Sequence, residues 1–210
     1  MRSKLHGLYA ITDETLTPDA TVVEQVNIAI DAGVSIIQYR NKTKSDAEVK
    51  EVCRELLTLC NAKNTLFIID DRPQLAQEIG AHGLHIGKDD MSLEEAKKIF
   101  PDGIIGVSCY GSVSKAKEAQ EMGADYVAFG SFFHSPTKPH SGIVSLSVLQ
   151  KAKNTLAIPV CAIGGINLKN IAQIAHERAD MISLVSAVFE GDIKENVTHL
   201  LAKMQQNSLR

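Results

Sequence analysis

The chain has 210 residues, of which 44% are hydrophobic and 22% charged, and its formal net charge is −3. A chain of this length can bury roughly 70–75% of its unfolded surface around one core, so we expect a single domain over residues 1–210. The negative charge excludes the broad basic field that sequence-independent nucleic-acid binding needs. No apolar run reaches the length of a signal peptide or a membrane span, so we expect a cytoplasmic protein without membrane contact.

Short apolar runs rich in β-forming residues alternate with longer amphipathic stretches along the chain. This change of period is typical of βα units on a parallel sheet. Eight strands are predicted, at Leu8–Thr12, Ser35–Tyr39, Leu66–Ile69, Gly83–Ile86, Ile104–Val107, Tyr126–Phe129, Pro159–Ile163 and Met181–Leu184.

Helices are predicted between these strands. Glu24–Asp31 and Asp46–Cys60 repeat apolar residues at three-to-four spacing, and Ser92 with Glu95 forms a capping box that opens Leu93–Phe100. Eight βα units predict an α/β fold of the (β/α)8 TIM-barrel type. The competing architecture is an open doubly wound sheet, which usually carries a glycine-rich turn after its first strand, a turn that this sequence lacks.

Polar side chains gather after the first strands of the predicted barrel, where barrel enzymes build their active sites. Gln38, Arg40 and Lys42 occupy alternate positions of an extended segment and therefore share one side of it. Two cations on one face form a clamp for an anion. The sequence thus predicts an anion site beside the second strand.

Carboxylates follow the third and fourth predicted strands, and Asp71 and Asp90 are the candidates for metal binding. Mg²⁺ prefers oxygen ligands and usually takes one or two carboxylates, with water and substrate phosphate in its other positions. Asp71 could instead start the turn into Pro73, and Asp90 could cap the next helix. After the fifth strand Ser108 offers a hydroxyl to a phosphate oxygen.

The last three strands lead into a different set of residues. A hydroxyl-rich loop with one lysine follows the sixth strand, Gly164 and Gly165 follow the seventh, and Val185 and Ser186 follow the eighth. Many barrels hold a phosphate on backbone N–H groups at these positions. A charged anion site and an uncharged one together predict two phosphorylated substrates, or one substrate with phosphate at both ends.

The motifs as a set resemble the thiamine-phosphate synthase family, in order and spacing, from Leu8 to about Phe189. They are Gln38-x-Arg40-x-Lys42, Asp71-Arg72-x-x-Leu75-Ala76, Gly83-Leu84-His85-Ile86-Gly87-x-x-Asp90, Ile105-Gly106-x-Ser108, Gly130-x-x-Phe133-x-Ser135-x-Thr137-Lys138, Gly164-Gly165-Ile166 and Val185-Ser186-Ala187. Asp70 and Lys88 depart from the family pattern, which usually has Asn and Gln there.

The resemblance implies a Mg²⁺-dependent transferase that joins a hydroxymethylpyrimidine diphosphate to a thiazole phosphate and releases pyrophosphate. Pyrophosphate would leave a pyrimidine-stabilised cation, which the thiazole nitrogen then attacks. We expect these small molecules as its partners, and a small homo-oligomer.

The resemblance also implies a role for each matching residue. Gln38 would face the pyrimidine, with Asp70 at the same substrate. Asp71 and Asp90 would carry the Mg²⁺. The catalytic pair for the departing pyrophosphate would be Ser108 and Lys138. Arg40 and Lys42 would hold the diphosphate, and the thiazole phosphate would be bound by Ser135, Thr137, Gly165, Val185 and Ser186.

Two rival functions remain open. A thiazole tautomerase on the same barrel uses a histidine soon after the glycine of the sixth strand, and His134 keeps that isomerase in consideration. A barrel that binds phosphorylated ligands without catalysis is the second rival, although it would have no use for metal-binding carboxylates. His85 ends an apolar strand and is interpreted as a hydrogen-bonded core histidine.

Overall fold

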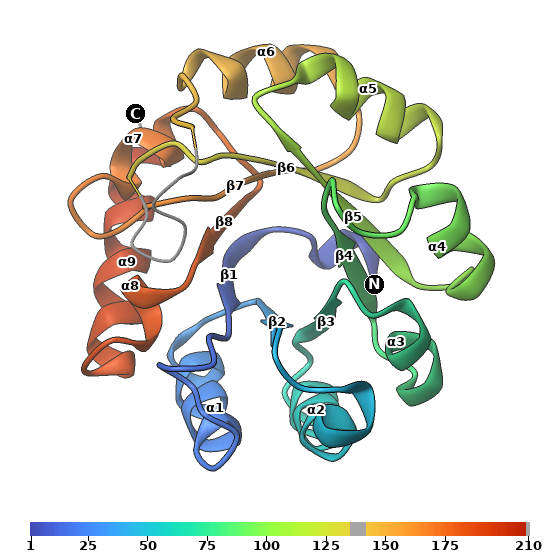
Figure 1. The fold of residues 1–210 in the computed structure, drawn as a ribbon. Coiled ribbons are helices and arrows are strands. Elements are labelled where there is room, and N and C mark those ends of the chain that lie inside the picture. Colours follow the sequence, from blue (N-terminus) through green and yellow to red (C-terminus); the bar gives the residue numbers. More distant parts are fainter. Residues whose placement is uncertain (135–141, 209–210) are drawn as a thin grey trace.

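The computed structural model describes residues 1–134 and 142–208, and the strands of this part close into one parallel barrel in the order β1 to β8 (Figure 1). Strand β1 pairs with both β2 and β8, which closes the ring. The predicted (β/α)8 barrel is confirmed. The strands are β1 Gly7–Ile11, β2 Ile36–Tyr39, β3 Leu66–Asp70, β4 Gly83–Ile86, β5 Ile104–Tyr110, β6 Tyr126–Phe129, β7 Val160–Ala162 and β8 Met181–Leu184.

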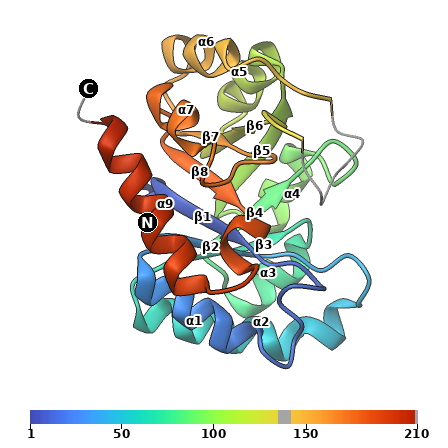
Figure 2. The ribbon, with the colours of Figure 1, turned by 90° about the vertical axis from the view of Figure 1, so that its left-hand side faces the viewer.

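The α-helices lie outside the ring of strands (Figure 1). Figure 2 shows the barrel from the side, with α1 and α2 on one flank and α5 and α6 on the opposite one. The helices are η1 Arg2–Lys4, α1 Val22–Ala32, α2 Asp46–Ala62, α3 Pro73–Ile79, α4 Leu93–Ile99, α5 Val113–Glu121, α6 Ser147–Thr155, α7 Ile171–His176, α8 Ser186–Phe189 and α9 Ile193–Ser208.

Local sequence explains where several helices begin and end. The predicted capping box of α4 is present, because Ser92 accepts from the backbone N–H of Glu95 and the Glu95 carboxylate accepts from that of Ser92. Helices α1 and α3 end at Gly33 and Gly80, whose φ angles of 119° and 70° are left-handed. Glycine takes this conformation without a steric penalty, so each helix stops where the next strand must begin.

Strand β5 differs from its prediction. It continues past Val107 to Tyr110, with a register shift against β6 between Ser108 and Tyr110. Ser108 was predicted to follow the fifth strand and instead lies within it. Because Ser108 is polar, it interrupts the apolar pattern from which the end of the strand was predicted. In the structure Ser108 pairs with Ala128 of β6, and this pairing keeps the backbone extended.

The apolar core has two layers. One fills the space between strands and helices, and the other fills the barrel interior with side chains such as Tyr9, Ile68, Tyr126 and Met181. Parallel strands covered on both faces need apolar residues at successive positions, which explains why every residue of β2, β3, β4 and β6 is buried. The four cysteines are all free and buried.

Gly106 allows the Tyr126 ring to fill the barrel interior. A Cβ atom at Gly106 would lie 2.0 Å from Cζ of Tyr126, far inside contact distance. Because Tyr126 is fully buried, its ring cannot move without displacing the core. We predict that Gly106→Ala lowers the free energy of unfolding by about 1–3 kcal/mol, as overpacking does. Urea denaturation measures this change.

Gly142→Ala is the matched control, because a Cβ at Gly142 meets nothing within 4 Å. Its free energy of unfolding should stay within about 0.5 kcal/mol of the wild type. Equal stabilities for the two variants would show that the Tyr126 ring yields without cost.

Candidate active site

A cavity of about 1160 Å³ opens at the carboxyl ends of the strands. Residues from or directly after all eight strands line it. Its volume exceeds the usual 300–1,000 Å³ of a small-molecule pocket, which suits two substrates bound together. The predicted site residues that line it are Gln38, Arg40, Lys42, Asp70, Asp90, Ser108, Gly165, Val185 and Ser186.

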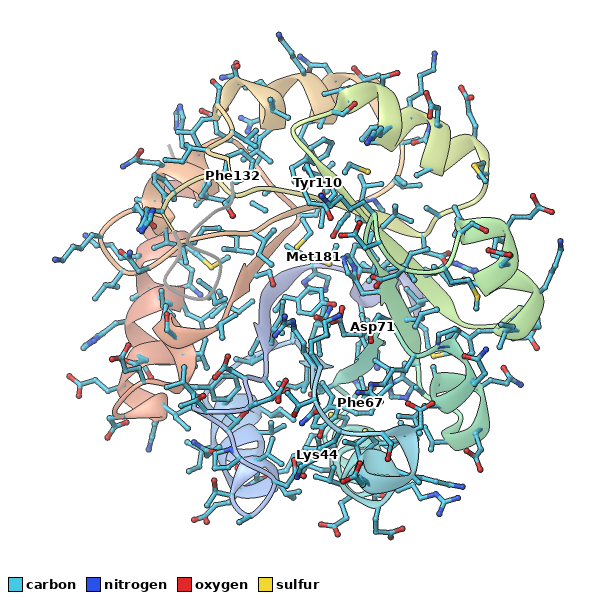
Figure 3. The ribbon with its side chains drawn as sticks, in the orientation of Figure 1. Lys44, Phe67, Asp71, Tyr110, Phe132 and Met181 are labelled. Carbon is cyan, nitrogen blue, oxygen red and sulfur yellow. The ribbon has the colours of Figure 1, made fainter. Side chains whose placement is uncertain are left out.

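Of the predicted residues that the structure describes, Asp71 alone is not among the lining. Asp71 belongs to the same region, because its carboxylate contacts Lys42. Figure 3 shows Asp71 beside β3 and β4, whereas Lys44 lies farther out beside α2. The predicted residues Ser135, Thr137 and Lys138 lie outside the described residues.

Cations and carboxylates alternate on the β2 and β3 side of the cavity. Lys42 Nζ lies 2.9 Å from Asp70 Oδ2 and also contacts Asp71 Oδ2. Arg40 Nε lies 3.7 Å from Asp70 Oδ2. Burial lowers the pKa of Lys42, but its contacts with Asp71 and Asp70 outweigh this and leave the pKa raised. Lys42 therefore stays charged at neutral pH.

Three side chains form hydrogen bonds that hold the loop that carries Lys42. Glu14 Oε1 accepts from the backbone N–H of Lys42 at 2.6 Å. Asn41 Oδ1 accepts from the N–H of Lys44 at 2.9 Å. Arg72 donates to the carbonyl oxygens of Asn41 and Lys44 at 2.5 and 2.6 Å, and to Asp46 Oδ1 at 2.5 Å. These bonds fix the backbone from which the Lys42 side chain extends.

Asp71 stands at the turn from β3 into α3. Its φ of 53° is left-handed, a conformation that Asp tolerates better than most residues. Burial raises the pKa of the Asp71 carboxyl, and so do the nearby carboxylates of Asp70 and Asp90, which together outweigh the hydrogen bond from Lys42. Asp70, Asp71 and Asp90 therefore form a region of concentrated negative charge.

The donor chemistry of this region fits Mg²⁺. Asp90 Oδ2 accepts from the N–H of Gly87 at 2.6 Å, which orients its carboxylate, and Asp90 does not cap α4, whose N-cap is Ser92. Within the described residues no group of three or more His, Cys, Asp or Glu side chains forms a metal-binding cluster. Two carboxylates are enough for Mg²⁺ when water and phosphate supply the remaining ligands.

The β7 and β8 side of the cavity is built mainly from backbone and small side chains. Gly164 and Gly165 have φ angles of 102° and 65°, and a Cβ at Gly165 would lie 2.3 Å from the carbonyl oxygen of His134. Helix α8 starts directly after β8, with Val188 and Phe189 donating back to the Val185 carbonyl. The first N–H groups of a helix lack acceptors within it, which suits an anion.

A chain of hydrogen bonds crosses the cavity floor and involves residues that the sequence did not suggest. Gln38 Nε2 donates to the Tyr9 hydroxyl at 2.7 Å, and the Tyr9 and Tyr126 hydroxyls lie 2.9 Å apart. His85 joins the Tyr126 hydroxyl to Ser108 Oγ, at 2.8 Å on each side. The interpretation of His85 as hydrogen-bonded is correct, but it also lines the cavity.

A family model described as thiamine monophosphate synthase matches residues 8–188 of the chain. The chain therefore belongs to the thiamine monophosphate synthase family.

Relatives agree over nearly the full length. The thiamine-phosphate synthase of Wolinella succinogenes is 40% identical over 211 residues, which is 99% of this chain and 98% of that one. The one from Thermoplasma acidophilum is 42% identical over 187 residues, or 89% and 86% of the two chains. The solved thiamine phosphate pyrophosphorylase from Pyrococcus furiosus is similar with a TM-score of 0.89 and 36% identity, covering 98% of both chains.

Membership of the thiamine monophosphate synthase family confirms the resemblance found in the sequence, and the protein is an enzyme of thiamine phosphate synthesis. The (β/α)8 fold that this family member shares with the Pyrococcus furiosus structure is confirmed as well. Among the described residues, none of the helices has the length and apolar character needed to cross a membrane.

Arg72 offers a test of how the Lys42 loop is held in this family member. Arg72→Ala removes three hydrogen bonds, two of them to loop carbonyl oxygens. We predict amide hydrogen exchange at least about tenfold faster at residues 42–44, together with a free energy of unfolding lower by about 1–3 kcal/mol. Mass-spectrometric hydrogen exchange reports the loop directly.

Arg54→Ala serves as the control for Arg72→Ala. Arg54 pairs at 3.6 Å with Glu51 on the same helix and is half exposed. The exchange of residues 42–44 should not change in this variant. Unchanged exchange in Arg72→Ala as well would mean that Glu14 and Asn41 hold the loop without Arg72.

Proposed function

We propose that this enzyme joins 4-amino-5-hydroxymethyl-2-methylpyrimidine diphosphate to 4-methyl-5-(2-hydroxyethyl)thiazole phosphate, giving thiamine phosphate and pyrophosphate. One observation carries the proposal. A single cavity has charged side chains along β2 to β4 and backbone with small side chains along β7 and β8. Two anions of different charge density can occupy such a cavity side by side, with the reacting atoms between them.

Arg40 and Lys42 would bind the diphosphate. In the free enzyme their charges are balanced by Asp70 and Asp71. An incoming diphosphate would replace these carboxylates as the ion-pair partner of Lys42. The bond from Glu14 to the backbone of Lys42 would keep the loop in place during that exchange. Gln38 lies two residues before Arg40 in the extended segment, on the same side, and would face the pyrimidine.

Asp71 and Asp90 would hold Mg²⁺, with Asp70 beside them. Bound Mg²⁺ would neutralise the diphosphate and stabilise the charge that collects on it as it leaves. The raised pKa of Asp71, caused by burial and by its neighbouring carboxylates, supports a cation here, because a cation would relieve that repulsion.

The thiazole phosphate would bind on the opposite side of the cavity. Gly165, Val185 and Ser186 line that side and offer N–H groups and a hydroxyl. Ser135 and Thr137 are proposed for the same phosphate from the family pattern. Holding both substrates in one cavity removes much of the entropic cost of bringing them together, which can be worth about 7–11 kcal/mol.

The reaction would begin with cleavage of the bond between the pyrimidine methylene carbon and the diphosphate oxygen. The bonding electrons leave with pyrophosphate, and the pyrimidine ring spreads the positive charge. The thiazole nitrogen lone pair then forms the new C–N bond. Ser108 would donate a hydrogen bond to the departing pyrophosphate, and Lys138 is proposed to add a positive charge, so the barrier falls as negative charge develops.

Lys42 and Lys44 give a matched pair of variants for the diphosphate site. Lys42 lines the cavity, whereas Lys44 on the same loop pairs with Asp19 at 2.5 Å and is not among the lining residues. Lys42→Ala should lower kcat/KM for the pyrimidine diphosphate by at least about tenfold, and Lys44→Ala should change it less than about twofold. Release of pyrophosphate and thiamine phosphate is the measurement.

The wild type decides between the proposed transferase and its rivals. A folded wild-type protein that binds thiazole phosphate but releases no pyrophosphate would refute the transferase. In that case isomerisation of the thiazole should be assayed next, because His134 lines the cavity where a tautomerase needs a histidine. Ligand binding without any turnover would instead indicate the non-catalytic barrel.

The proposed metal ligands predict a specific change in metal dependence. Asp90→Asn and Asp71→Asn should each raise the Mg²⁺ concentration for half-maximal rate by about tenfold or more, because each removes a charged oxygen ligand. Asp89→Asn is the control, since Asp89 is 85% exposed and its one ion pair among the described residues is a 4.0 Å contact with Lys88. Equal Mg²⁺ dependence in all three variants would place the metal elsewhere.

A further inference from the structure

Five side chains from five strands form a continuous chain of hydrogen bonds across the cavity floor, here called the floor relay. It runs from Gln38 on β2 through Tyr9 on β1 and Tyr126 on β6 to His85 on β4 and Ser108 on β5. Each step spans 2.7 to 2.9 Å between the two heavy atoms. The two ends are a residue proposed to face the pyrimidine and one proposed to contact the leaving group.

The middle of the floor relay is buried and tightly packed. Tyr9 is 2% exposed, Tyr126 is fully buried and His85 is 9% exposed. The His85 and Tyr126 rings stack with centroids 5.6 Å apart, and the two tyrosine rings meet edge to face at 6.2 Å. Burial raises the pKa of Tyr9 and of Tyr126, so both hydroxyls keep their protons at neutral pH.

The donors and acceptors of the floor relay set its direction. The Gln38 amide N–H can only donate, so Tyr9 accepts from it and has one proton of its own to place. Among the described residues the Tyr9 hydroxyl is hydrogen-bonded to Gln38 and to Tyr126, which leaves Tyr126 as the acceptor of its proton. Tyr126 then donates to His85 Nδ1, and the Nε2–H of His85 donates to Ser108 Oγ.

The reverse direction of hydrogen bonding leaves one hydroxyl proton without an acceptor in the relay. If His85 donated from Nδ1 to Tyr126, and Tyr126 donated to Tyr9, the Tyr9 hydroxyl would accept twice and its own proton would have no acceptor in the relay. An unsatisfied buried donor costs free energy, and one such loss is enough to set the direction of a short chain. The forward direction satisfies every proton between Gln38 and Ser108.

We infer that His85 is a positioning residue: the floor relay fixes it as the Nε2–H tautomer, so that Ser108 accepts from His85 and directs its own hydroxyl proton into the cavity. This inference rests on the proposed function, in which a diphosphate leaves beside Ser108. A hydroxyl already turned toward the developing charge costs no reorientation during the reaction. Its effect should therefore appear in kcat rather than in substrate binding.

Tyr126→Phe breaks the floor relay in its middle while keeping the ring that packs against Gly106. We expect kcat to fall about tenfold, with KM for both substrates within about twofold of the wild type. Ser108→Ala should lower kcat by a similar factor, and the double variant should be no slower than Ser108→Ala alone, because both changes remove one interaction. Independent, multiplicative losses would overturn the inference.

Tyr39→Phe is the matched control. Tyr39 is also buried, but its hydroxyl donates to Asp19 at 3.2 Å and the residue is not among the cavity lining. Its kcat should equal that of the wild type. A loss equal to that of Tyr126→Phe would mean that any buried tyrosine hydroxyl matters, and the relay would have no special role.

Nitrogen-15 NMR of the imidazole ring tests the direction without any activity measurement. The wild-type protein should show His85 as the Nε2–H tautomer at neutral pH, and Tyr126→Phe should lose that fixed tautomer. The Nδ1–H tautomer or a doubly protonated ring in the wild type would overturn the inference. This readout also separates the two proposals, since a protein that makes no thiamine phosphate can still show the predicted tautomer.

Discussion

Closure of the parallel ladder is the constraint on which the site depends. Because β1 pairs with β2 on one side and β8 on the other, every strand has two neighbours and all eight carboxyl ends share one rim. Tyr9 and Tyr126 are 117 residues apart in sequence, yet their hydroxyls meet inside the ring. A register slip of one residue would turn each inward side chain outward. The set of side chains that line the cavity therefore depends on the strand register.

The charges of the cavity are balanced in pairs. Asp70 is largely buried, and its negative charge is met by Arg40 and Lys42. Removal of one partner from such a pair leaves an uncompensated charge in a poorly solvated place, which costs more than the pair contributes. In the proposed reaction a metal diphosphate brings a cation to the carboxylates and an anion to Arg40 and Lys42. Both halves of the charged region therefore keep partners when substrate binds.

The sequence predicts the strands and the alternation of Gln38, Arg40 and Lys42 well, because both follow from the two-residue period of an extended chain. Three features could not be predicted from the sequence. The extension of β5 through Ser108 depends on the ladder with β6. Asp71 has a left-handed backbone and its carboxylate contacts Lys42, and neither fact can be read from the strand pattern. Tyr9 and Tyr126 occur in apolar strands, so the sequence pattern indicates only that they are core residues. Their hydroxyls meet because the closed ring of strands brings β1 and β6 side chains together in its interior.

The inner layer of a barrel is normally filled with branched apolar side chains, and here two tyrosines pack among them. Their hydroxyls are buried and would destabilise the core if they lacked partners. Complete satisfaction of the floor relay removes that cost, and it also leaves each member with one low-energy orientation. The orientation of Ser108 is then set by strand register, which the whole barrel maintains. The proposed precision at the reacting end of the cavity thus comes from the core, because each buried hydroxyl of the floor relay is hydrogen-bonded to its neighbours in the relay.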